Sequence, residues 1–153
     1  KVNPNNTKKN DTEYSNPDVI VSEDTGSGLD EYNAYANIIR ENMEIDILYQ
    51  QYPYDKELLD GIYDLILETV LCKSGNVIIA SNEYPVQLVK SKFLKLNSSH
   101  IQYVMDCLKE TTSKVRNIKK YLLAALFNAP STMKSYYQAE VNHDMPQFVV
   151  RAI

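Results

Sequence analysis

Histidine and cysteine side chains could supply catalysis or metal binding, but here their positions match no known site pattern. His100 and His143 stand far apart, and neither belongs to a paired-ligand spacing. Cys72 and Cys107 fall at the end of one predicted helix and within another, where a structural role is more common than a nucleophilic one. The chain has no glycine-rich phosphate loop and no nucleophile elbow, and no spacing singles out a general acid/base pair. We therefore expect a protein that is not an enzyme and that uses no metal and no cofactor.

Lysine and arginine side chains, which could bind phosphate, are concentrated in the second half of the chain. Residues 1–72 hold five Lys or Arg against fifteen Asp or Glu, whereas residues 73–134 hold ten against three. The net charge of −4 is therefore an average over an acidic stretch and a basic one. Two clusters make up most of the basic stretch: Lys90, Lys92 and Lys95, and then Lys114, Arg116, Lys119 and Lys120.

The second basic cluster stands at the start of a predicted helix. Cations at a helix N-terminus oppose the helix macrodipole, so helix stability does not explain their placement. The same end offers free backbone N–H groups, which favour phosphate. The pattern predicts nucleic-acid contact by the basic 90–120 block, with a merely solvated charged face as the alternative.

Three carboxylates form a candidate site of the opposite charge. Asp60, Asp64 and Glu68 recur every four residues, which places them on one face of a predicted helix. This stripe would bind a basic partner, and a solvated outer face is again the alternative.

The elements that must position these residues are mostly helical. Residues 1–29 resemble a flexible linker, and the folded domain is predicted to span residues 30–140, followed by a C-terminal tail at 141–153. Apolar residues at helical spacing predict a mainly α, compact domain of about five to six helices. A β-branched run at 77–80, bounded by turn residues, predicts a small β-hairpin at about 76–84.

The sequence also predicts where several helices begin and end. Asp55 is expected to cap the helix that follows it, with Tyr54 packed on Leu59 as a hydrophobic staple. Ser99 and Gln102 match a capping box. Pro130 is expected to end the helix that starts near Asn117, and a short final helix is expected at 133–139.

The cysteine count and the lengths of the apolar runs indicate the cellular compartment and whether the chain contacts a membrane. Two cysteines cannot build a disulfide scaffold, so we expect reduced thiols and a bacterial, cytoplasmic protein. No apolar run approaches the ~20 residues that span a bilayer, so no membrane contact is predicted.

Several longer stretches resemble one known family. They are Tyr52-Pro53-Tyr54-Asp55, Ile79 to Pro85, Val89 to Leu96 with Ser99-His100-Ile101, and Val115 to Ala129. This order of motifs resembles the C-terminal domain of replication initiator protein A, of the RepA_N type carried by plasmids and mobile elements. The resemblance extends from about residue 41 to residue 144, and the domain is in turn similar to the C-terminal domain of the primosomal protein DnaD.

The resemblance implies an excised C-terminal domain with its preceding linker. It also implies a role in recruiting host replication proteins, such as a primase, a helicase loader or an initiator, to the origin. The DnaD domain ends in a helix with Tyr, Ile and Trp at four-residue intervals, which is implicated in DNA binding. Tyr121 matches the Tyr and is a candidate DNA contact, whereas Ala125 and Ala129 stand at the other two positions. The base-stacking surface of the Trp is therefore absent from this chain.

Three functions follow as hypotheses. The first is a non-catalytic replication-initiation domain that recruits host proteins. The second is auxiliary DNA binding by the 90–120 block, and the third is self-association.

Overall fold

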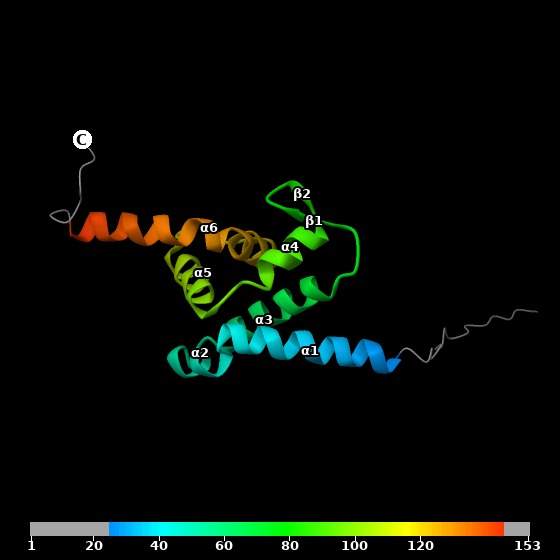
Figure 1. The fold of residues 1–153 in the computed structure, drawn as a ribbon. Helices are drawn as coiled ribbons and strands as arrows, with labels where there is room; N and C mark the ends of the chain where they lie inside the picture. Colours follow the sequence, from blue (N-terminus) through cyan, green and yellow to red (C-terminus); the bar gives the residue numbers. More distant parts are fainter. Residues whose placement is uncertain (1–24, 146–153) are drawn as a thin grey trace, which may run out of the picture. The chain divides into compact units, whose positions relative to one another are not determined.

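A computed structural model describes residues 25–145, which form six helices and one two-stranded antiparallel sheet (Figure 1). The elements follow one another as α1 (Thr25–Met43), α2 (Ile45–Gln51), α3 (Lys56–Leu71), β1 (Asn76–Ile79), β2 (Asn82–Pro85), α4 (Val86–Phe93), α5 (Ser98–Glu110) and α6 (Ile118–Asp144). The predicted fold class, mainly α with a small hairpin, is confirmed.

The chain divides into two units, residues 1–34 and residues 35–153. Of the first unit the structure describes residues 25–34, which form the first part of α1. Helix α1 begins at Thr25, within the stretch that was predicted to be a flexible linker. The remainder of the predicted linker and the end of the predicted C-terminal tail lie outside the described residues.

Helix α3 supplies the largest share of the core in the second unit, and it packs against α2, α4 and α6. Its buried side chains are Leu59, Ile62, Leu65, Ile66, Leu67, Thr69 and Val70, and all of them except Leu67 recur at the helical spacing of one face. The largest fully buried side chains of its neighbours include Leu48, Phe93 and Leu126. The hydroxyl of Thr69, the one buried polar side chain of the described residues, donates to the Leu65 carbonyl 2.8 Å away.

The hairpin pairs Val77 with Tyr84 and Ile78 with Glu83 across a two-residue turn. The turn residues Ala80 and Ser81 both have positive φ, at 51° and 70°. Two left-handed residues in a two-residue loop define a type I′ turn, whose twist matches that of the strands. This turn is built here without glycine.

The start of α3 differs from the prediction in its chemistry. Asp55 does occupy the N-cap position, but its side chain makes no capping hydrogen bond. It instead accepts from Lys109 Nζ at 2.8 Å. Tyr54 is 98 % exposed, so the predicted staple on Leu59 is wrong.

The cap of α5 lies two residues before the predicted one. Asn97 Oδ1 accepts from the backbone N–H of His100, and His100 Nδ1 accepts from the backbone N–H of Asn97. This reciprocal pair is a capping box with histidine in the place of the usual Glu or Gln. Gln102, which was expected to close the box, donates to Gln51 Oε1 at 2.8 Å.

Helix α6 runs through Pro130, so the predicted helix end there is wrong. A proline removes one backbone hydrogen bond of the helix and strains the preceding turn. Packing on both sides of the proline offsets that cost. Ala129 is fully buried, and Tyr136 stacks edge-on against Tyr103 of α5 with ring centroids 5.2 Å apart. The helix therefore also includes the residues expected to form a separate short helix at 133–139.

Candidate functional site

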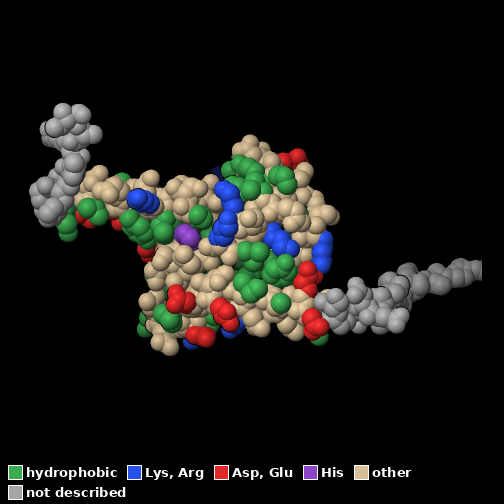
Figure 2. All heavy atoms as spheres, viewed as in Figure 1, with side chains coloured by type: hydrophobic (Ala, Val, Ile, Leu, Met, Phe, Trp, Pro, Cys, Tyr) green, Lys and Arg blue, Asp and Glu red, His purple; other side chains and the backbone are tan. Residues whose placement is uncertain are grey.

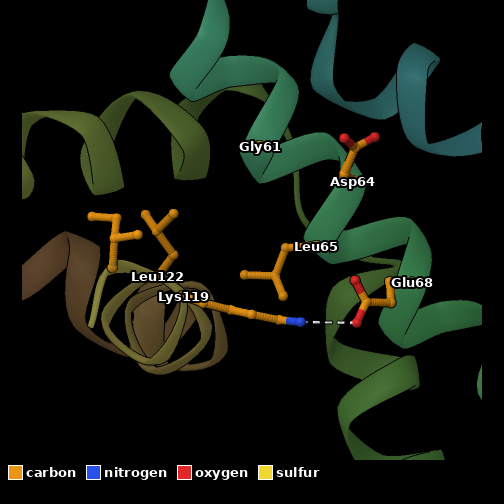
Figure 3. Close-up of a pocket in the computed structure, with 7 residues that line it drawn as sticks. Gly61, Asp64, Leu65, Glu68, Lys119 and Leu122 are labelled. Carbon is orange, nitrogen blue, oxygen red and sulfur yellow. Dashed lines mark hydrogen bonds and ion pairs between the residues drawn. The ribbon is translucent and has the colours of Figure 1, made fainter.

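A groove lies between α3 and the first turns of α6, and the close-up shows how its side chains are arranged (Figure 3). It encloses about 240 Å³ and is lined by Gly61, Asp64, Leu65, Glu68, Ile118, Lys119 and Leu122. Leu65 and Leu122 are largely buried and form an apolar floor. Charged side chains form the rim.

One ion pair closes the end of this groove. Lys119 reaches across from α6, and its Nζ lies 3.0 Å from Glu68 Oε1 (Figure 3). Both side chains are 63 % exposed, so the pair contributes little to stability. The ion pair instead affects where the charges lie, because it joins Glu68 of the predicted acidic stripe to Lys119 of the predicted basic cluster.

Two residues leave the groove open. Gly61 has no side chain, and a Cβ built there would meet nothing within 4 Å. Ile118 is 47 % exposed at the first position of α6. Sequence reasoning missed both residues as site residues, although a glycine in the middle of a regular amphipathic helix was a usable signal.

The three members of the acidic stripe differ in their partners. Asp60 accepts a hydrogen bond from the hydroxyl of Tyr49, which raises the pKa of that tyrosine to about 12. Glu68 is paired with Lys119. Asp64 has no hydrogen-bond or ion-pair partner among the described residues, and its carboxylate points away from the ion pair (Figure 3).

The first basic cluster is partly engaged within the fold. Lys90 Nζ lies 4.7 Å from the ring centroid of Tyr35, and Lys92 Nζ lies 4.2 Å from that of Phe127. These are cation–π contacts, in which the ring face attracts the ammonium. Lys95, in contrast, is exposed and has no ion pair within the described part of the chain.

The second basic cluster retains three uncommitted cations. Lys114, Arg116 and Lys120 are exposed, and none has an ion pair with another described residue. Lys and Arg side chains lie beside apolar patches in the space-filling view (Figure 2). A second hollow, of about 370 Å³, lies between the hairpin and α6 and is lined by Ile78, Ala80, Ser81, Lys120, Tyr121 and Ala124.

Tyr121 is half-buried, and its hydroxyl lies 3.4 Å from Thr111 Oγ1. The position eight residues later differs sharply in burial. Ala129 is fully buried in the core, so a side chain at this position does not face solvent. In the DnaD pattern this last position holds the Trp, whose ring could stack on a base. In this chain both the small size of alanine and its burial exclude such a stacking surface.

His100 and Cys107 are partly buried, whereas Cys72 and His143 are exposed. Burial lowers the pKa of His100, whose ring closes the α5 capping box. Burial also raises the pKa of the Cys107 thiol, which disfavours the reactive thiolate. No group of three or more His, Cys, Asp or Glu side chains within residues 25–145 is placed to hold a metal ion. None of the described helices combines the length and apolarity needed to cross a membrane.

Residues 25–145 form a small helical domain with a groove between α3 and α6 and a hollow between the hairpin and α6. The chain belongs to DUF6017, a family of unknown function, whose model matches residues 7–147. No curated protein and no solved structure matches the chain significantly.

Proposed function

We propose that this chain is a non-catalytic docking domain of a DNA replication initiator. In this role it recruits replication proteins of the bacterial host, in the cytoplasm, to the origin of a plasmid or mobile element. The replication context rests on the resemblance of the quoted motifs, and the docking role rests on the groove between α3 and α6.

The groove is the observation that carries the docking role. It joins an apolar floor to a charged rim, which is the usual composition of a protein-binding surface. Its α6 wall, with Ile118, Lys119 and Leu122, belongs to the longest stretch of the resemblance. Its α3 wall is opened by Gly61, where even a methyl group would contact nothing.

Purified host proteins provide the test. The full chain is immobilised and offered a primase, a helicase loader and an initiator separately, in three forms: unchanged, Gly61→Ala and Gly61→Leu. We expect one host protein to bind the unchanged chain and Gly61→Ala, and to lose binding to Gly61→Leu, whose side chain fills the groove. Gly61→Ala is the matched control, because both substitutions improve helix propensity and only the larger one occupies the space.

Two results would overturn the proposal. If none of the three host proteins binds the unchanged chain, the recruiting role is wrong. If binding survives Gly61→Leu, the groove is not the docking site.

The other two predicted functions have less support from the geometry. Auxiliary DNA binding by the 90–120 block would use seven cations, but Lys119 is paired with Glu68, and Lys90 and Lys92 lie on aromatic rings. Self-association stays a prediction, which light scattering of the full chain tests.

A further inference from the structure

We infer that the hollow between the hairpin and α6 binds an acidic peptide segment. An apolar side chain of this peptide enters the hollow, and its carboxylates pair with Lys120 and with the basic residues that precede α6. This surface is separate from the groove described above, so the inference does not depend on the proposed function.

The two surfaces lie on opposite sides of the same helix end. Positions 118 and 122 line the α3 groove, whereas positions 120 and 124 line the hollow beside the hairpin. Two residues along a helix correspond to a rotation of about 200°. The start of α6 can therefore contact two different partners at once.

The hairpin leaves an apolar wall uncovered at this hollow. Ile79 is 2 % exposed and packs into the core, and its strand neighbour Ile78 faces the other way and is 63 % exposed. Alternation along β1 makes this unavoidable for a two-stranded sheet that is packed on one face only. Covering such a side chain with an apolar group would release about 25 cal/mol per Å² of buried surface.

The turn keeps the hollow open. Ala80 and Ser81 are small residues held in left-handed backbone conformations. These are the conformations that the type I′ turn requires at both of its central positions. Together with Ala124 on α6, these residues line a space that one bulky side chain can occupy.

Charge selects the class of partner. Lys120 lines the hollow, and Lys114 and Arg116 shortly precede it in the chain. All three lack an acidic partner among residues 25–145, unlike Lys119 and Lys109, which are both paired. Glu83 lies directly opposite Ile78 in the register and does not line the hollow. An acidic segment would therefore lie toward α6 and away from β2.

A peptide fits these observations better than a nucleic acid does. Nucleic acid needs a continuous row of cations along its backbone and aromatic faces for its bases. Of the three unpaired cations only Lys120 lines this hollow, and its walls are mostly aliphatic, with Ile78, Ala80 and Ala124 around the half-buried Tyr121. A peptide with one apolar side chain beside several carboxylates would match both the apolar walls and the nearby cations.

Fluorescence anisotropy on the full chain tests the inference. The probe is a labelled peptide of consecutive aspartates that ends in phenylalanine. The comparison probes are the same peptide ending in glycine, and a labelled single-stranded oligonucleotide of equal net charge. The variants are Lys120→Glu and Ile78→Thr, which keeps the β-branched side chain that suits a strand. Lys134→Glu, at an exposed position later in α6 and outside the hollow, is the matched charge control.

We expect the phenylalanine-ended peptide to lose about tenfold or more in affinity with either Lys120→Glu or Ile78→Thr, and to keep its affinity with Lys134→Glu. The glycine-ended peptide should bind about tenfold more weakly to the unchanged chain. Absence of peptide binding, or equal loss with Lys134→Glu, would overturn the inference. Oligonucleotide binding that needs Lys120 but not Ile78 would also overturn it, and would identify the surface as a nucleic-acid site.

Discussion

Replacing Gly61 by alanine should stabilise this protein, and the size of the effect follows from the structure. Gly61 lies in the middle of α3, is exposed, and has no positive φ. A Cβ at this position contacts nothing within 4 Å, so the new methyl group adds neither a clash nor a packing contact. What remains is the intrinsic difference between glycine and alanine in a helix interior, about 1 kcal/mol in favour of alanine. We expect the free energy of unfolding to rise by that amount and the midpoint temperature by about 3 to 6 °C.

Gly75 provides the matched control of opposite sign. A Cβ there also meets nothing within 4 Å, but the residue has a φ of +102°. An L-residue is strained in that region of backbone space, so Gly75→Ala should destabilise by about 1 kcal/mol or more.

Urea denaturation followed by circular dichroism measures both changes. Unchanged m-values would show that the difference lies in stability and not in compactness. If Gly61→Ala were neutral or destabilising while Gly75→Ala behaved as expected, the open surroundings of Gly61 would be wrong. The presence of a glycine beside the groove would then need no functional explanation.

Three further changes test the packing and the caps. Asn97→Ala removes the side chain that accepts from the His100 N–H, and should cost about 1 kcal/mol in urea denaturation. Burial lowers the pKa of His100, so its folded-state pKa lies below its unfolded-state pKa. The stability that the neutral form contributes is therefore fully present above the unfolded-state pKa. It is lost as the pH falls through the folded-state pKa. Stability should therefore drop as the pH falls below the unfolded-state pKa of histidine, about 6.5, and His100→Gln, which keeps a capping side chain, should remove this contribution to the drop. Leu126→Ala empties a fully buried position of α6 and should cost about 2–5 kcal/mol by the same assay.

The parts of the fold that sequence reasoning predicted are those set by local periodicity. The apolar spacing of α3 predicted its buried face from Leu59 to Val70, because apolar side chains that recur every three or four residues share one face of a helix, and that face packs into the core. The β-branched run and its turn residues predicted the hairpin for an equally local reason.

The errors arose where tertiary contacts outweigh a local rule. A proline usually ends a helix, but the burial of Ala129 and the stacking of Tyr136 on Tyr103 continue α6 past Pro130. Ser99 and Asn97 were both suitable caps for α5, and the sequence did not show that His100 could serve as the reciprocal acceptor for Asn97. Asp55 was expected to cap α3, the helix that follows it. In the folded chain Lys109 lies close enough to bind its carboxylate instead.

The charge pattern shows most clearly what sequence order conceals. Acidic residues dominate the first half of the chain and basic residues the second, which suggested two surfaces of opposite sign. Folding brings the halves together, since Asp55 pairs with Lys109 and Glu68 pairs with Lys119. Each of these exposed pairs is worth at most about 1 kcal/mol, so stability alone does not account for the distribution of charge.

The charges that folding leaves unpaired are therefore the informative ones. Asp64 stands unpaired on the rim of the α3–α6 groove, and Lys120 stands unpaired at the hollow on the opposite side of α6. Each lies beside exposed apolar surface, from Ile118 in one case and Ile78 in the other. An unpaired charge next to an uncovered apolar side chain is the combination that a complementary protein segment recognises. The same short helix end thus separates the two proposed docking surfaces, and substitutions at Gly61 and Lys120 distinguish them.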